Sequence, residues 1–79
     1  MKVTVYSKDN CSYCTKAINL LETTDLEVTE MKLDKDFSRD EILEWFPDAR
    51  TFPIITLDNQ WIGGYNELVE VVDEWKRND

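Results

Sequence analysis

The sequence predicts an α/β protein whose strands and helices follow the order β-α-β-α-β-β-α along 79 residues. Three observations support this prediction. Hydrophobic and polar residues alternate in the first segment, hydrophobic residues recur with helical spacing in two later segments, and a two-residue turn separates two strand-like runs. A chain of this length buries a single core. We therefore expect one domain over residues 1–79.

The first part of the chain is expected to form a strand, a helix and a second strand. Val3 and Val5 alternate with polar neighbours in KVTVY (residues 2–6), which is the period of two of a strand. The spacing i, i+3, i+4 and i+7 of one buried helix face follows at Cys14, Ala17, Ile18 and Leu21. Residues 26–33, LEVTEMKL, are rich in strand-forming residues, but their alternation is irregular and leaves the buried face unassigned.

A short second helix is expected within FSRDEILEWFP, residues 37–47. Ser38 and Glu41 have the spacing of a capping box, and Phe37 and Ile42 occupy the positions of a hydrophobic staple. Pro47 disfavours helical backbone at the residue before it, so the helix should end there.

The last part of the chain is expected to form a β-hairpin and a final helix. PIITL (53–57) and QWI (60–62) are strand-like, and Asp58-Asn59 between them can adopt the positive φ angles of a tight hairpin turn. Asn66 is the expected N-cap of the final helix. The helical spacing recurs at Leu68, Val71, Val72 and Trp75.

The charge balance argues against a nucleic-acid partner. The chain has 17 acidic and 9 basic residues, a net charge of -8, whereas nucleic-acid affinity depends on clustered Lys and Arg. No apolar run approaches the roughly 20 residues of a membrane span, and no signal-peptide pattern precedes KVTVY. We expect a cytoplasmic protein that contacts neither nucleic acid nor membrane.

Both cysteines lie in KDNCSYC, residues 8–14, and this stretch raises the question of function. A reducing compartment disfavours a permanent structural disulfide. A structural zinc site needs four ligands, and the chain has no His and no Cys besides Cys11 and Cys14, so no metal site is expected within it. Three interpretations stay open: redox exchange, which the C-x-x-C spacing after a strand favours, a metal cluster shared between two copies, and two ordinary buried thiols.

Redox exchange requires a thiolate, and the expected fold places Cys11 where a thiolate is stabilised. Cys11 lies at a helix N-terminus with Lys8 upstream in the same loop, and both features lower the pKa of a thiol. Cys14 lies one turn further on and points inward. We therefore expect Cys11 to be the catalytic nucleophile and Cys14 to attack the mixed disulfide formed on it.

The sequence resembles the glutaredoxin family, within the thioredoxin-like fold, across nearly the whole chain. The matching motifs are VYSKDNCSYC (5–14), TFP (51–53) and GGYNEL (63–68), followed by a short terminal helix, whereas the WCGPC motif usual in thioredoxins is absent. The resemblance implies a four-stranded mixed sheet flanked by three helices, with the first two strands parallel and the hairpin strands antiparallel. It also implies a thiol-disulfide oxidoreductase active in electron transport.

The resemblance further implies a glutathione site. Pro53 would follow a cis bond and expose the Phe52 backbone to the cysteinyl part of glutathione; without the resemblance, Pro53 reads as an ordinary edge-strand start. Phe52 replaces a smaller β-branched residue, and Asn66 replaces a frequent Asp, so both affect glutathione affinity. Lys8, Arg39 and Arg50 are candidates for the glycyl carboxylate. The implied glutathione-binding residues are Lys8, Tyr13, Arg39, Arg50, Thr51, Phe52, Pro53, Gly63, Gly64, Tyr65 and Asn66.

The function that the resemblance implies is reduction of protein disulfides and glutathione mixed disulfides. Glutathione would be the reductant, with no tightly bound cofactor. The expected partners of this monomer are glutathione and disulfide-bearing proteins, ribonucleotide reductase being a natural family substrate. Two alternatives are a redoxin recharged by thioredoxin reductase and a noncatalytic carrier that holds an iron-sulfur cluster between two copies.

Overall fold

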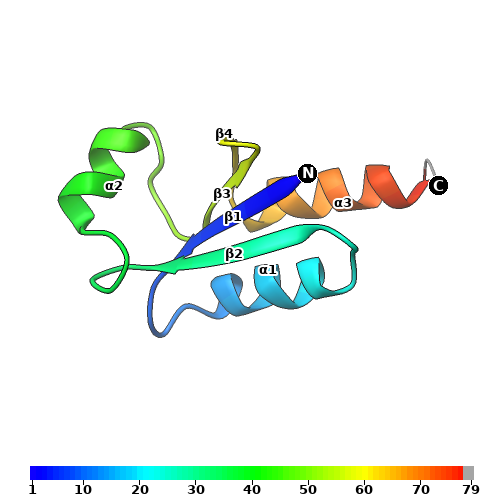
Figure 1. The fold of residues 1–79 in the computed structure, drawn as a ribbon, viewed down its shortest axis with the longest axis horizontal. Coiled ribbons are helices and arrows are strands. Elements are labelled where there is room, and N and C mark those ends of the chain that lie inside the picture. Colours follow the sequence, from blue (N-terminus) through cyan, green and yellow to red (C-terminus); the bar gives the residue numbers. More distant parts are fainter. Residues whose placement is uncertain (78–79) are drawn as a thin grey trace.

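The order of strands and helices is the one that the sequence predicts (Figure 1). The structure is a computed structural model and describes residues 1–77. Its elements are β1 (Lys2–Ser7), α1 (Ser12–Glu22), β2 (Glu27–Lys32), α2 (Arg39–Trp45), β3 (Ile54–Leu57), β4 (Gln60–Gly63) and α3 (Tyr65–Arg77).

The strands form one mixed sheet in the order β2-β1-β3-β4. β1 pairs with β2 in parallel and with β3 antiparallel, and β4 pairs antiparallel with β3. Because β1 has a neighbour on each side, Val3 and Val5 lie at the centre of the sheet and are fully buried. β2 is an edge strand with mostly exposed or half-buried residues, which explains its irregular hydrophobic pattern.

Helices cover both faces of this sheet, as the resemblance implies. α1 and α3 lie side by side against one face, and α2 lies apart from them (Figure 1). The first core consists of Val3, Val5, Ala17, Leu21, Ile55, Leu68 and Val72. The second core, beside α2, consists of Phe37, Ile42 and Ile54, with Tyr6 and Phe52 packed against it.

Two local predictions, the capping box and the hairpin turn, are confirmed. The Ser38 side chain accepts a hydrogen bond from the Glu41 N–H, and the Glu41 carboxylate accepts one from the Ser38 N–H, at 3.1 and 3.0 Å. Asp58 and Asn59 have φ angles of 48° and 71° in the turn between β3 and β4. These residues tolerate such angles because their short polar side chains can bond locally.

The predicted N-cap of the final helix is wrong. α3 begins at Tyr65, so Asn66 lies inside its first turn. The Leu68 N–H donates to the Gly64 carbonyl at 3.1 Å, which makes Gly64 the N-cap residue. The Glu67 carboxylate, three residues later, accepts the Gly64 N–H at 2.7 Å. This is half of a capping box, because glycine has no side chain to return the bond.

Within residues 1–77, none of the helices combines the length and the hydrophobicity needed to cross a bilayer.

Candidate active site

The two cysteines occupy the positions that the sequence predicts for them. Cys11 is the N-cap of α1, with extended backbone at φ -121° and ψ 102°, and is half-buried. Cys14 is 3% exposed and faces the core. The cysteines form a disulfide across a Cα–Cα distance of 5.3 Å, so α1 brings them within bridging range without any change of backbone.

The first turn of α1 directs a backbone donor at the Cys11 sulfur. The Cys14 N–H donates to Cys11 Sγ at 3.2 Å. This N–H has no partner within the helix, and the positive end of the helix dipole adds to its effect. The same donor can stabilise a Cys11 thiolate after reduction, which is the chemistry that a redox pair requires.

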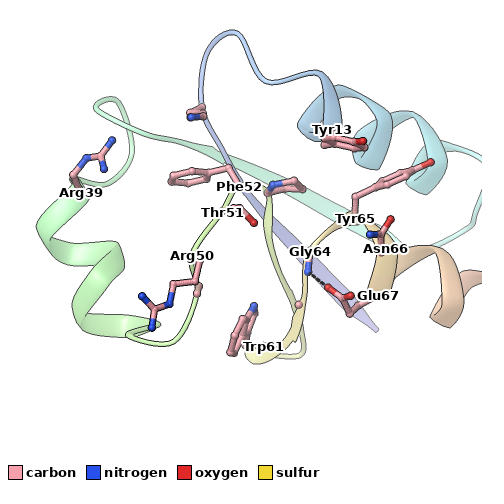
Figure 2. A pocket seen from close by; sticks show the side chains of 14 residues that line it. Tyr13, Arg39, Arg50, Thr51, Phe52, Trp61, Gly64, Tyr65, Asn66 and Glu67 are labelled. Carbon is pink, nitrogen blue, oxygen red and sulfur yellow. Dashed lines mark hydrogen bonds between the residues drawn. The ribbon is translucent and has the colours of Figure 1, made fainter.

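A groove of about 640 Å³ lies beside the cysteine loop (Figure 2). Every residue predicted to bind glutathione lines it, although these residues come from five separate segments of the chain. They are Lys8, Tyr13, Arg39, Arg50, Thr51, Phe52, Pro53, Gly63, Gly64, Tyr65 and Asn66. Among the described residues that line the groove, Tyr13 is included, but the disulfide-bonded Cys11 and Cys14 on either side of it are not.

Three further residues line the groove and were not predicted to do so: Ala49, Trp61 and Glu67. Trp61 is 39% exposed on β4. Glu67 could have been found by its spacing of three from Gly64, the interval of a capping box, had Gly64 been taken as the N-cap.

The segment before β3 forms one wall of the groove. The Phe52-Pro53 peptide bond is cis, as the resemblance implies. The Phe52 ring stacks on Phe37, with ring centroids 6.3 Å apart, and the Lys8 ammonium lies 5.7 Å from the Phe52 ring centroid. The Lys8 ammonium thus lies over the aromatic wall of the groove, an arrangement that permits a cation–π interaction.

Two tyrosines and two glycines form the other wall. Tyr13 is 53% exposed, and its ring centroid lies 5.7 Å from that of Tyr65 (Figure 2). A Cβ atom at Gly64 would lie 3.4 Å from the Pro53 carbonyl oxygen, so the glycine pair passes close to the TFP segment. Gly63 has a φ of 127°, which side chains rarely adopt, and glycine is therefore required there.

The groove carries opposite charges at its two ends. Arg39 and Arg50 line it on the side of α2, and Glu67 lines it at the start of α3 (Figure 2). Lys8 lines it from the cysteine loop. Across residues 1–77 the ion pairs are Lys32–Asp9 and Arg77–Asp73, so none of these three cations has a carboxylate partner there. A cationic end without a partner is suited to an anionic ligand.

Residues 1–77 contain no cluster of three or more His, Cys, Asp or Glu side chains arranged to hold a metal ion. The chemistry that the described residues offer is that of the cysteine pair and the groove beside it.

A redox-active cysteine pair at the start of the helix after the first strand, on this mixed sheet, defines a thiol-disulfide oxidoreductase with a thioredoxin-like fold. The glutaredoxin family model matches residues 3–62, and the chain belongs to the glutaredoxin family. Glutaredoxin 3 of Escherichia coli K12 is 32% identical over 66 residues, which cover 84% of this chain and 80% of that protein.

Solved structures of the family agree with the fold. Glutaredoxin 1 from Francisella tularensis, complexed with cacodylate, superposes with a TM-score of 0.79 at 25% identity, covering 96% of each chain. A buckwheat glutaredoxin-glutathione complex superposes with a TM-score of 0.76 at 26% identity, covering 94% of this chain and 70% of that one.

Proposed function

We propose that the protein reduces protein disulfides and glutathione mixed disulfides with glutathione as the electron donor. The observation that carries this proposal is the groove, which brings every residue predicted to bind glutathione to one surface beside the cysteine loop. The glutathione complex of the related buckwheat protein supports the same ligand. We further propose one glutaredoxin domain over residues 1–79, acting as a monomer in the cytoplasm, where glutathione keeps thiols reduced.

In this proposal Cys11 is the nucleophile. Its thiolate attacks one sulfur of a substrate disulfide, forms a mixed disulfide and releases the other sulfur as a thiolate. The Cys14 thiolate then attacks Cys11 Sγ, releases the reduced substrate and forms the Cys11–Cys14 disulfide present in this structure. The substrate gains the two electrons that the cysteine pair loses.

Two glutathione molecules return the pair to its dithiol form. The first glutathione thiolate attacks Cys11 Sγ, forms a glutathionyl mixed disulfide and frees the Cys14 thiolate, which takes up a proton. The second glutathione attacks the glutathionyl sulfur, releases glutathione disulfide and leaves Cys11 as the thiolate. The Cys14 N–H at the Cys11 sulfur supports Cys11 as the leaving group, since it stabilises the departing thiolate.

The charges and backbone of the groove suggest an orientation for glutathione. Its glycyl carboxylate would lie at the cationic end, near Lys8, Arg39 and Arg50. Its cysteinyl backbone would pair with that of Phe52, as an added strand pairs with a sheet edge. Its γ-glutamyl end would lie over Gly63 and Gly64, toward the first turn of α3. Ribonucleotide reductase is the protein substrate that we propose to test first, by analogy with the family.

The test compares Cys14→Ser with Cys11→Ser in two assays. Cys14→Ser should keep activity on a small glutathionylated substrate, because that exchange needs only Cys11, and should lose most activity on a protein disulfide. Cys11→Ser should lose both activities. Equal losses from the two variants in both assays would contradict these roles.

The electron donor is tested separately. The oxidised protein is incubated with glutathione or with thioredoxin reductase and NADPH, and free thiols are counted over time. Reduction by glutathione is expected. Reduction by thioredoxin reductase alone would instead support the alternative of a redoxin that is recharged by that enzyme. A purified protein that carries an iron-sulfur chromophore and does not exchange disulfides would instead support the carrier function.

A further inference from the structure

Trp61 lines the groove but has no part in the proposed binding of glutathione. The three parts of glutathione are assigned to the TFP segment, to the glycine pair and to the three cations of the groove. Trp61 belongs to none of these, yet it is 39% exposed and lines the same groove. Figure 2 shows Trp61 and Arg50 at the same end of the groove, away from Tyr13. The groove therefore continues, on an aromatic surface, beyond the residues that glutathione needs.

Packing against α2 restrains the Trp61 ring. Trp61 pairs with Thr56 across the sheet, and Thr56 pairs with Thr4. Their side chains therefore share one face of the sheet, the face away from the first core. On this face lies the ring of Phe46, the C-cap residue of α2, with its centroid 6.5 Å from that of Trp61. A restrained, half-exposed tryptophan loses little freedom on binding, which suits it to anchor a protein partner.

Trp61 lies beyond the glycyl end of a bound glutathione. Thr4, which is in register with Trp61 across β3, lies three residues before Ser7, where β1 ends and the cysteine loop begins. This separation is roughly 10 Å along the sheet, and two strand spacings of about 4.8 Å each add to it across the sheet. Glutathione has one residue after its cysteine, and an extended residue spans only about 3.3 Å. A polypeptide covers the distance with about two to four residues after its cysteine, since the side chains also reach toward each other.

The charge at this end of the groove indicates which polypeptides fit. Arg39 and Arg50 line the groove, and the ion pairs of residues 1–77 leave both without a carboxylate partner there. The chain as a whole is acidic, with a net charge of -8, so these cations stand in contrast to the rest of its charge. A substrate segment with an acidic residue after its cysteine therefore meets complementary charge on the way to Trp61.

We propose that the Trp61 end of the groove is a docking surface for protein substrates. Its occupant is an extended segment of a disulfide-bearing protein that carries, after its cysteine, an acidic residue and then an aromatic or large apolar side chain. The acidic residue pairs with the cations, and the apolar side chain packs on Trp61. This inference rests on the proposed function, because it continues the same groove from the same substrate cysteine. It concerns the part of a protein substrate that glutathione lacks.

The test measures binding without redox chemistry. The reference probe is the peptide acetyl-Gly-Cys-Asp-Ser-Ser-Ser-amide, with its cysteine S-methylated. Three further probes each carry one Phe in place of one of the three serines. Titrated into the oxidised protein, at least one Phe peptide should bind about ten-fold more tightly than the reference, as expected for an aromatic anchor in an interface. In NMR spectra the indole N–H signal of Trp61 should move on binding, whereas that of Trp75 should not.

The variants separate a docking contact from a structural effect. Trp61→Ala should remove the preference for Phe, so that the ratio of the two affinities falls to about one. A loosened fold would weaken both peptides alike and leave this ratio unchanged. Trp61→Phe keeps an aromatic ring and should retain part of the preference. A thermal melt of each variant checks that the fold is kept.

Trp45→Ala is the matched control. Trp45 is 47% exposed, its ring centroid lies 6.2 Å from that of Tyr6, and it does not line the groove. Its replacement removes an equal aromatic side chain at a different place and should leave the preference for Phe unchanged.

A peptide with Asn in place of Asp tests the role of charge. It should bind the wild type more weakly than the Asp peptide with the same Phe. The difference should shrink as salt is added, because salt screens the attraction between exposed charges.

Each outcome decides the inference. Equal binding of the reference and all three Phe peptides, or no binding of any probe, would overturn the docking surface. A preference that survives in Trp61→Ala, or that is lost equally in Trp45→Ala, would overturn it as well. Equal affinities for the Asp and Asn peptides would refute the acidic partner. The expected binding pattern without glutathione-dependent turnover would refute the proposed function and leave the docking surface standing.

Discussion

Replacing Gly63 with Ala tests the geometry that shapes the α3 end of the groove. The Gly63 φ of 127° is unfavourable for any residue with a Cβ, and holding alanine there costs roughly 1–3 kcal/mol. The new Cβ would also lie 2.5, 2.6 and 2.9 Å from Oε1, Cγ and Cδ of Glu67. Glu67 must therefore move away and lose its bond to the Gly64 N–H.

The two costs add up to a measurable loss of stability. A lost hydrogen bond of this kind contributes about 0.5–1.5 kcal/mol, so the free energy of unfolding should fall by about 2–4 kcal/mol in total. For a domain of this size, that corresponds to a melting temperature lower by roughly 10–30 °C. Thermal unfolding followed by circular dichroism measures the shift, and chemical denaturation gives the free energy.

Gly64→Ala is the matched control, because the neighbouring glycine has different surroundings. A Cβ there meets the Pro53 carbonyl oxygen at 3.4 Å and Glu67 Oε1 at 3.7 Å, which are ordinary contacts, and its φ is not positive. Its effect should stay within about 1 kcal/mol. Repeating Gly63→Ala in a Glu67→Ala background removes the collision and should reduce its cost by about 1 kcal/mol. Equal stability of the two single glycine variants would refute the reasoning, and a zero coupling energy would refute the collision.

The remaining predictions concern the start of α2 and the turn between β3 and β4. Ser38→Ala removes one half of the α2 capping box and should lower the free energy of unfolding by about 1 kcal/mol, measured by urea denaturation; an unchanged midpoint would mean that the cap is not stabilising. Asn59, with a φ of 71°, should tolerate glycine without loss, whereas Asn59→Val should cost roughly 1–2 kcal/mol or more. If both Asn59 variants melted at one temperature, the turn would not depend on its positive φ.

The order of the elements and most of their local features follow from the sequence alone. Period-two alternation at Val3 and Val5, helical spacing from Cys14 to Leu21 and the Ser38–Glu41 capping box depend only on residues close together in the chain. The physical preferences that they reflect act over one or two turns. The start of α3 was mispredicted because Asn66 and Gly64 are both acceptable N-caps, and local preference does not choose between them.

The candidate site likewise combines features that the sequence predicts with features that only the tertiary structure shows. The roles of Cys11 and Cys14 as helix start and buried partner follow from their spacing, and family motifs indicated the other groove residues. Only the tertiary structure brings Lys8, Arg50 and Tyr65 to one surface, because the sheet register and the packing of α2 and α3 set distances between segments far apart in the chain. The same packing of distant segments places Trp61 and Glu67 along the groove. A side chain that lines a groove is recognised by its three-dimensional neighbours, and for Glu67 those are Gly63 and Gly64, where β4 passes into α3.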